Sequence, residues 1–498
     1  MKQNALLGYD IGSSSIKAAL LDADTGALIA SETSPAGEMK IDSSRIGWAE
    51  QHPDTWWQHV VLATKQIFDR IGKNSCTVMG IGISYQMHGL VIVDRDYKVL
   101  RPSIIWCDSR AVDIGNQALN TLGTEYCLGN CLNSPGNFTA SKLKWVKDNE
   151  SDLYARIFKF MLPGEYIGLR LTGEIRSTVS GLSEGIFWDF KKKKIADGIL
   201  NHYGIDRKLL PETAPTFSIQ GKLTTDAASE LDLAAGIPVA YRAGDQPNNA
   251  LSLNVLNPGE VAATAGTSGV IYGVADKPLY DLKSRVNPFA HVNYSPENPN
   301  IGILLCINGT GILYSWLKQT VLDNRYTYDE LNKIASATEI GAQGLLCYPY
   351  GNGAERSLEN KEIQAHFSGI NFNIHGKDHL VRAAQEGIVF SFRYGLDIMK
   401  EMGMKINVIR AGYTNLFQSE LFRKAFVNTC RVDLEIYNTD GSQGAALGAG
   451  LGIGYYSSPD EAFKGLNLIG RLHPDQKMAD QYNTIYQRWK NILSTMLR

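Results

Sequence analysis

The sequence predicts an α/β protein built from two domains. With 498 residues the chain is too long for a single hydrophobic core. Short apolar runs typical of strands alternate along it with longer amphipathic stretches typical of helices. A Gly/Ser/Thr-rich hairpin pattern also occurs twice, once at the start and once near residue 260. Two halves that open alike predict two similar domains facing a shared cleft.

The first thirty residues read as strand, turn, strand, turn, strand. Residues 5–9 and 16–21 are apolar, and the polar residues 10–15 between them form the first expected turn. Residues 24–26, Asp-Thr-Gly, form the second. The other elements expected in this half include a helix at 56–71 and strands at 78–83 and 90–93.

The pattern near residue 260 repeats this opening. Residues 260–265 and 270–274 read as strands, and the Gly-Thr-Ser-Gly of residues 266–269 joins them. The Asn-Pro-Gly of residues 257–259 predicts a turn at the boundary between the two halves.

Composition and charge are those of an ordinary globular protein. Residues are 44% hydrophobic and 20% charged, and the formal net charge is -2, so no basic footprint for nucleic acid is expected. No apolar run reaches the ~18 residues of a membrane span, and Asp10 interrupts the first apolar stretch, which argues against a secretory signal. The seven cysteines contain no Cys-x-x-Cys pair and suit a reducing compartment. We therefore expect a cytoplasmic protein without nucleic-acid or membrane partners.

The two hairpins are the candidate phosphate-binding segments. The sequence contains neither G-x-x-x-x-G-K-[ST] nor G-x-G-x-x-G. Successive backbone N–H groups in a tight turn of small residues can instead form an anion-binding nest. Residues 12–15 and 266–269 both have this chemistry, although either one alone could be an ordinary hairpin.

Two carboxylates stand at strand ends. Asp10 directly precedes the first turn, where it could equally cap that turn. Asp245 lies in the polar stretch 242–250 between two apolar segments. Phosphoryl transfer to an alcohol needs one carboxylate to accept the hydroxyl proton and another near the metal, which makes Asp245 and Asp10 the candidate pair.

Polar and aromatic residues at other strand ends are candidates for binding hydroxyl groups. Residues 86–89, Gln-Met-His-Gly, separate two apolar strands, and residues 106–110 follow another. Planar hydrogen-bonding side chains beside an aromatic wall suit a sugar. The Gly-rich residues 441–454 are expected to pack a helix closely through small side chains rather than to bind nucleotide.

These segments together resemble the FGGY carbohydrate kinases along essentially the whole chain. Residues 10–17 and 266–269 resemble the family's two phosphate loops, and Gly244-Asp245 resembles its catalytic segment. The resemblance implies two actin-like, ribonuclease-H-like domains flanking a deep catalytic cleft. It implies that residues 1–256 bind sugar and form the first phosphate loop, and that residues 257–498 bind nucleotide.

The same resemblance implies the roles of individual residues. Asp245 is the expected general base, and Asp10 with Asp245 is expected to hold Mg²⁺, mostly through water. The expected sugar-binding residues are Gln86, Met87, His88, Trp106, Asp108, Asp245 and Gln246. The expected ATP-binding residues are Gly12, Ser13, Ser14, Ser15, Lys17, Gly266, Thr267, Ser268, Gly309, Gly311, Gly412 and Asn415. The run at residues 411–415 departs from the Gly-Gly-Gly-Ala-Arg-Ser of many members, which could alter nucleotide preference.

Within the family, residues 86–89 and 133–145 resemble the xylulose-phosphorylating members. That implies D-xylulose as substrate and D-xylulose 5-phosphate as product. Ribulose, sedoheptulose, gluconate and glycerol are the alternative substrates. An actin-like ATPase switch and a sugar sensor without activity are the rival classes, and a homodimer is among the oligomeric states left open.

Overall fold

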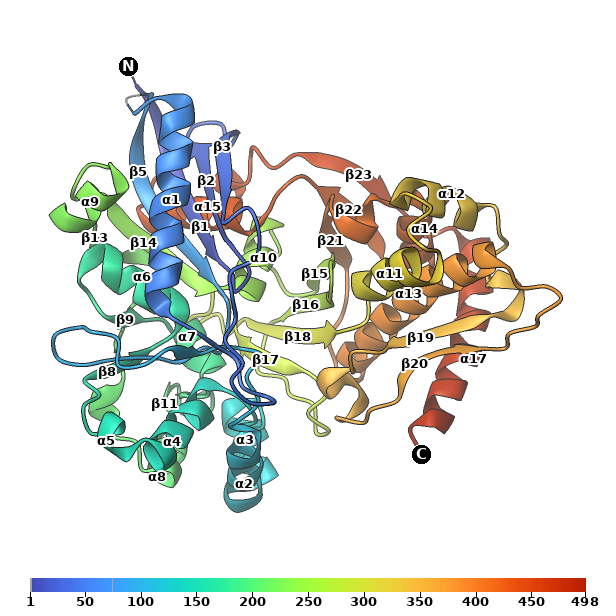
Figure 1. Cartoon of the computed structure of the whole chain (residues 1–498), viewed down its shortest axis with the longest axis horizontal. Coiled ribbons are helices and arrows are strands. Elements are labelled where there is room, and N and C mark those ends of the chain that lie inside the picture. The colour runs from blue at the N-terminus through green and yellow to red at the C-terminus, as the bar shows by residue number, and fades with distance from the viewer. Residues whose placement is uncertain (1, 74) are drawn as a thin grey trace. The chain divides into compact units, whose positions relative to one another are not determined.

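The computed structural model describes residues 2–73 and 75–498, which form two compact units (Figure 1). The first unit contains Met1–Leu256, Phe289–Ile301 and Thr439–Leu466, and the second contains Asn257–Pro288, Gly302–Asn438 and Asn467–Arg498. The expected ranges 1–256 and 257–498 therefore omit two later segments that return to the first unit.

A six-stranded sheet forms the centre of the first unit. Its strands, in spatial order, are β13 (Phe217–Lys222), β14 (Pro238–Gly244), β5 (Cys76–Tyr85), β1 (Gln3–Ile11), β2 (Ile16–Asp22) and β3 (Leu28–Ser34). The strand β1 pairs antiparallel with β2 and parallel with β5, and β5 pairs parallel with β14. The carboxyl ends of β14, β5 and β1 therefore meet at one edge of the sheet.

Helices and short strands surround this sheet. The helices of the first unit are α1 (Pro53–Ile71), α2 (Val112–Leu122), α3 (Thr124–Cys131), α4 (Thr139–Asn149), α5 (Ser151–Tyr154), α6 (Pro163–Thr172), α7 (Val179–Glu184), α8 (Asp197–Tyr203), α9 (Thr225–Leu231), α10 (Asp245–Ser252), α15 (Gly441–Gly452) and α16 (Pro459–Ala462). Its short strand pairs are β4 (Glu50–Gln51) with β7 (Ser103–Ile104), β6 (Val91–Val93) with β8 (Lys159–Met161), β9 (Arg176–Ser177) with β12 (Glu212–Thr213), and β10 (Trp188–Asp189) with β11 (Lys194–Ile195).

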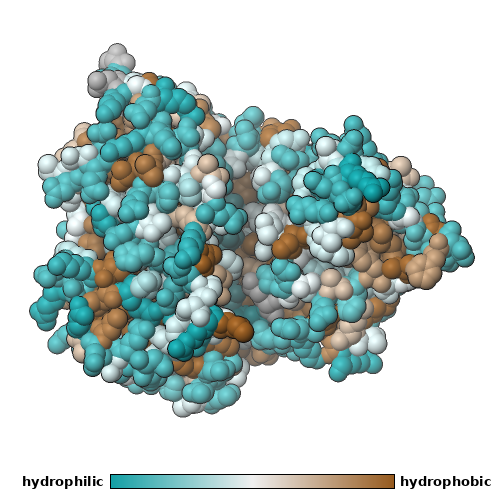
Figure 2. All heavy atoms as spheres, in the orientation of Figure 1, coloured by the Kyte–Doolittle hydropathy of each residue, from teal (hydrophilic) through white to brown (hydrophobic). Residues whose placement is uncertain are grey.

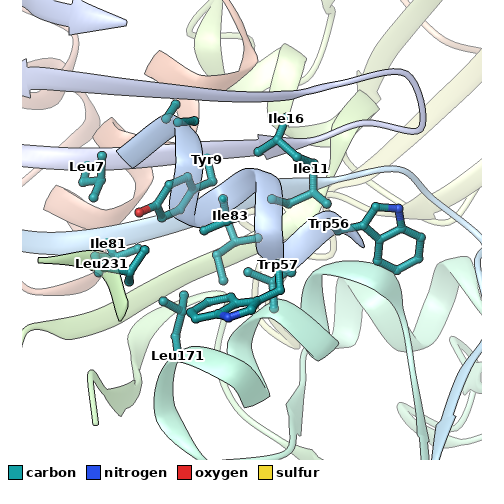
Figure 3. Packing of buried hydrophobic residues seen from close by; sticks show 14 of the residues in the cluster. Leu7, Tyr9, Ile11, Ile16, Trp56, Trp57, Ile81, Ile83, Leu171 and Leu231 are labelled. Atoms are coloured by element: carbon teal, nitrogen blue, oxygen red, sulfur yellow. The ribbon is translucent and has the colours of Figure 1, made fainter. Parts of the chain in front are cut away.

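The strand β1 is buried on both faces because a helix covers each of them. Its alternate residues Leu7, Tyr9 and Ile11 pack in one cluster with Trp56 and Trp57 of α1 (Figure 3). Its residue Leu6 points to the other face and packs with α15. A strand covered on both faces reads as a continuous apolar run, as residues 5–9 do.

A seven-stranded sheet dominates the second unit. Its order is β17 (Asn287–Ala290), β18 (Ile301–Ile307), β16 (Gly269–Ala275), β15 (Glu260–Ala265), β21 (Val408–Gly412), β22 (Asp433–Tyr437) and β23 (Leu468–Leu472). The other elements are the hairpin of β19 (Leu346–Tyr350) and β20 (Gln364–Ser368) and the helices α11 (Gly311–Trp316), α12 (Tyr328–Ser336), α13 (Lys377–Glu401), α14 (Glu420–Cys430) and α17 (Gln476–Met496).

The two sheets share one topology, which confirms the internal repeat predicted from the sequence. The order β3-β2-β1-β5-β14 in the first unit corresponds to β18-β16-β15-β21-β22 in the second. In the first sheet β1 pairs antiparallel with β2 and parallel with β5, and β5 pairs parallel with β14. In the second sheet β15 pairs antiparallel with β16 and parallel with β21, and β21 pairs parallel with β22. The expected pair of actin-like, ribonuclease-H-like α/β domains is confirmed.

The Gly-rich segment predicted to pack closely forms α15, and that prediction is confirmed. A Cβ added at Gly8 of β1 would lie 2.0 Å from the Ser442 carbonyl oxygen, and one at Gly82 of β5 would lie 1.9 Å from that of Ala445. The glycines bring the backbones of strand and helix into direct contact, which fixes α15 on the sheet beside the carboxyl ends of its strands.

The visible surface of each unit is mostly hydrophilic, with small apolar patches between the polar residues (Figure 2). No helix within residues 2–73 and 75–498 combines the length and apolar character that crossing a membrane requires.

Candidate functional site

Three neighbouring parallel strands bring the predicted sugar and base residues of the first unit together. Asp10 lies near the end of β1, Gln86 follows β5, and Asp245 follows β14. The register pairs Asp10 with Ser84, and Ser84 with Ala243, so these residues stand side by side at one sheet edge. Open α/β sheets bind ligands at the carboxyl ends of their strands, and this edge is therefore the candidate site.

Asp10 is partly buried and fixed by its neighbours. Its Oδ1 accepts a hydrogen bond of 2.9 Å from the Ser84 hydroxyl, and Lys17 stands opposite it on β2. Burial raises the pKa of Asp10, while the Lys17 charge and the Ser84 hydrogen bond oppose that effect. Asp440, the N-cap of α15, adds a further negative charge that raises the pKa of Asp10.

Asp245 is the first residue of α10, and its carboxyl group has a raised pKa. Burial, together with the negative charge of Asp10, raises its pKa to about 7. Hydrogen bonds from Gln246 oppose that shift. A carboxyl group that titrates near neutrality can accept and release a proton at physiological pH.

The segment after β5 supplies polar groups to the same edge. The Gln86 side chain is buried, and neither its amide nitrogen nor its amide oxygen has a hydrogen-bond partner among the described residues. A buried amide without partners is costly unless a ligand completes its hydrogen bonds. Met87 is buried against Gly244, the residue before Asp245.

His88 is positioned in the same segment. Its Nδ1 lies 3.1 Å from the Glu184 carbonyl oxygen, and its ring packs edge-on to Phe138 at 4.7 Å between ring centroids. A carbonyl oxygen can only accept a hydrogen bond, so Nδ1 carries the proton and a neutral ring has its lone pair on Nε2.

In the other predicted segment, residues 106–110, Trp106 and Asp108 lie in different environments. Trp106 is half-exposed, and its indole N–H donates to the Ser13 hydroxyl at 3.2 Å. Asp108 is completely buried, and its carboxylate accepts hydrogen bonds from Arg110 and from the Ala49 backbone N–H at 2.6 Å. Because both carboxylate oxygens are engaged, these contacts favour a structural role for Asp108 over the sugar contact predicted from the sequence.

The first hairpin joins β1 to β2 in a tight turn. Gly12 N–H donates to the Ser15 carbonyl at 3.1 Å, and a Cβ at Gly12 would lie 2.9 Å from that oxygen. Gln51 Nε2 donates to the Ser13 carbonyl at 2.7 Å, and Met39 N–H donates to that of Ser14 at 2.7 Å. With these carbonyls engaged, the turn is held in shape beside Asp10.

The second hairpin, in the second unit, is braced in a similar way. The Gly266 carbonyl accepts from Gly311 N–H and from the Thr310 hydroxyl, both at 2.8 Å. Thr267 and Ser268 are exposed at the tip of the turn. A Cβ at Gly309 would lie 1.2 Å from the Pro349 carbonyl oxygen, so only glycine fits there.

The remaining predicted nucleotide residues lie near this second hairpin. Gly412 ends β21, which is parallel to β15, so its carboxyl end stands beside the hairpin. Asn415 has a left-handed backbone, with φ of 52°, and its side-chain amide is 3.4 Å from a Cβ built on Gly266. The predicted sugar-binding residues and the first hairpin therefore lie in the first unit. The second hairpin and the residues predicted to contact the nucleoside lie in the second unit.

Sequence reasoning missed Glu184, which contacts the His88 backbone from the end of α7. No local pattern marks it, since a single glutamate in residues 179–184 resembles any helical residue.

The fold and the comparisons with known proteins together define the class of the chain as a carbohydrate kinase. Residues 5–252 match the N-terminal domain, and residues 261–452 the C-terminal domain, of the FGGY family of carbohydrate kinases. The chain belongs to that family.

Two bacterial relatives match this chain over nearly its whole length. It is 27% identical to a xylulose kinase of Bacillus subtilis, over 98% of this chain and 96% of the relative. It is 28% identical to a xylulose kinase of Lactococcus lactis, over 98% and 96%. A crystal structure of a xylulose kinase from Brucella ovis has a TM-score of 0.89 at 25% identity and covers 99% of both chains.

Proposed function

We propose that the protein phosphorylates D-xylulose with ATP, giving D-xylulose 5-phosphate and ADP, and that it does so in the cytoplasm. The observation that carries the proposal is Asp245, a carboxyl group with a pKa of about 7 beside the unpartnered Gln86 amide. The named relatives support the choice of sugar, because those described above are xylulose kinases. The described cysteines are all free thiols, which suits a reducing compartment.

In the proposed reaction, Asp245 accepts the proton of the terminal hydroxyl group. The hydroxyl oxygen forms a bond to the γ-phosphorus of ATP, and the bond between that phosphorus and the bridging oxygen of ADP breaks. Gln86 and His88 hold other hydroxyl groups of the sugar, Met87 and Trp106 provide apolar walls, and Gln246 orients Asp245. The sugar contact of Asp108 stays a prediction.

The hairpins are the proposed phosphate-binding elements. In the first unit, backbone N–H groups of Ser13–Ser15 offset phosphate charge, Gly12 shapes the turn that presents them, and Lys17 adds a positive charge. In the second unit, backbone N–H groups of Gly266–Ser268 have the same role toward the nucleotide phosphates. Gly309, Gly311, Gly412 and Asn415 border the nucleoside in this proposal.

Mg²⁺ fits the donor chemistry of the first unit. Asp10 and Asp245 offer carboxylate oxygens, which this ion prefers. Among the described residues no group of three or more His, Cys, Asp or Glu side chains is arranged to hold a metal. The protein would therefore supply few ligands, with water and phosphate oxygens completing the shell, and the bound ion would offset phosphate charge.

The pKa of Asp245 predicts a pH profile. Below about 7 the carboxyl group is increasingly protonated and cannot accept the hydroxyl proton, so kcat/KM should fall about tenfold per pH unit there. Above that value kcat/KM should reach a plateau. Initial rates with D-xylulose between pH 5 and 9 measure this. A flat profile down to pH 5 would contradict the assignment of Asp245 as base.

The hydrogen bond from the Thr310 hydroxyl to the Gly266 carbonyl predicts that removing it will raise the KM for ATP. Thr310→Val keeps the shape of the side chain but removes the hydroxyl that donates to the Gly266 carbonyl. Loss of one hydrogen bond costs about 1 kcal/mol, so KM for ATP should rise roughly fivefold while KM for sugar stays unchanged. Equal rises in both KM values would show a general structural effect instead.

An ADP-coupled assay over a panel of sugars tests the proposed function. We expect the largest kcat/KM for D-xylulose and lower values for D-ribulose, sedoheptulose, gluconate and glycerol. A preference for another member of the panel would leave the kinase assignment intact and overturn the sugar. ADP release that no sugar stimulates would favour an actin-like ATPase switch.

A further inference from the structure

His88 has a backbone conformation that its surroundings must hold in place. Its φ is 61°, in the left-handed region that residues other than glycine seldom adopt. Such conformations are strained and persist where neighbouring groups enforce them. The orientation of the ring therefore depends on whatever anchors this peptide.

Two buried ionisable side chains provide that anchor. Glu184 Oε1 accepts a hydrogen bond from His88 N–H at 3.1 Å, and Lys142 Nζ donates to the His88 carbonyl at 2.9 Å. The Glu184 backbone carbonyl also accepts a hydrogen bond from the ring Nδ1–H, at 3.1 Å between Nδ1 and the oxygen. Neither Glu184 nor Lys142 is exposed to solvent. His88 is thus held at its N–H, its carbonyl and its ring.

The Glu184 carboxyl group also reaches the segment that carries Asp245. A Cβ at Gly244 would lie 2.7 Å from Glu184 Oε2, so this oxygen packs directly against the residue before Asp245. Tyr85 OH donates to the same oxygen at 3.4 Å. One side chain therefore contacts the segment after β5 and the segment after β14.

Glu184 is buried, and no side chain among residues 2–73 and 75–498 forms an ion pair with it, whereas the buried Glu386 pairs with Arg382 at 2.6 Å. Burial, with the nearby Glu165 and Asp245 charges, holds the pKa of Glu184 well above its ordinary value. A buried carboxyl group placed at such cost, on the two segments that carry the proposed base and sugar residues, indicates a role in the site.

We propose that Glu184 is a positioning residue that fixes the orientation of His88 and thereby sets selectivity among ketoses. The inference rests on the proposed function. With Nδ1 protonated against Glu184, His88 presents Nε2 as an acceptor for one sugar hydroxyl, in a direction set by its anchored peptide and the Phe138 ring. A sugar whose hydroxyl group cannot reach Nε2 loses this hydrogen bond, and the site therefore binds it less well.

Two conservative substitutions of Glu184 test separately the length of its side chain and the charge of its carboxyl group. Glu184→Gln keeps the length and an acceptor oxygen, so KM for D-xylulose should stay within about threefold of wild type. Glu184→Asp keeps the carboxyl group but withdraws it by one methylene, so KM for D-xylulose should rise roughly tenfold or more. The preference for D-xylulose over D-ribulose should narrow in the Asp variant, while KM for ATP stays unchanged.

Glu386→Asp is the matched control, because it shortens a comparably buried glutamate in the second unit. It should lower the melting temperature without altering sugar selectivity. Combining Glu184→Asp with His88→Ala supplies a second test. If Glu184 acts through His88, the double variant should have the sugar KM of His88→Ala alone, rather than the product of both effects.

The outcomes distinguish the inference from the function on which it rests. A wild-type enzyme that phosphorylates no ketose overturns the proposed function, and this inference with it. An active wild-type enzyme with an unchanged sugar KM in Glu184→Asp overturns the inference alone. Additive effects in the double variant, or parallel rises in the sugar and ATP KM values, would likewise show that Glu184 does not act through His88.

Discussion

Replacement of Asp245 by Asn should lower kcat about 10²–10⁴-fold while ATP and sugar still bind. Asn preserves the size of the side chain, but its amide oxygen is too weak a base to take the hydroxyl proton. The loss corresponds to about 3–5 kcal/mol of transition-state stabilisation. Single-turnover rates and equilibrium binding of D-xylulose, measured on the same preparation, check both parts of this expectation.

The control for that experiment is Asp96→Asn, at an exposed position outside the candidate site. It should leave kcat within about twofold of wild type. If Asp245→Asn retained half of the wild-type kcat, Asp245 would not be the base, and the proposed reaction would need another proton acceptor.

Gly82→Ala should produce a large loss of stability in the first unit. The new Cβ would lie 1.9 Å from the Ala445 carbonyl oxygen, and a helix backbone cannot yield as a flexible side chain does. Overpacking of this kind costs about 3 kcal/mol, which lowers the melting temperature by roughly 6–12 °C. Differential scanning calorimetry of the full chain measures the shift.

Gly37→Ala is the matched control, since a Cβ at Gly37 has no heavy atom within 4 Å. It should change the melting temperature by less than about 2 °C. Equal melting temperatures for Gly82→Ala and Gly37→Ala would show that α15 is not packed against β5 as described.

Much of the fold could be predicted from local patterns. The apolar runs at residues 5–9 and 260–265 became β1 and β15, and each small-residue turn became a hairpin. These signals are local, because a buried strand must be apolar and a tight turn must contain small residues. The Gly-rich residues 441–454 likewise carried their own evidence of close packing.

Local sequence patterns could not predict features that depend on contacts between distant parts of the chain. The sequence shows no sign that Thr439–Leu466 returns to the first unit, because this depends on which sheet α15 covers. The contacts of Asp108 with Arg110 and with the Ala49 backbone N–H could not be read from the sequence either, and its sugar contact stays a prediction. Burial raises the pKa of Asp245, and so does the negative charge of Asp10, a residue that lies 235 positions earlier in the chain.

The most direct test of the central claim is to identify the product. Purified protein, ATP, Mg²⁺ and D-xylulose should yield one sugar phosphate per ADP, and ³¹P NMR with coupling to the terminal carbon protons should place the phosphate on C5. Asp245→Asn under the same conditions should give almost none. ADP accompanied by inorganic phosphate, with no phosphorylated ketose, would contradict the account.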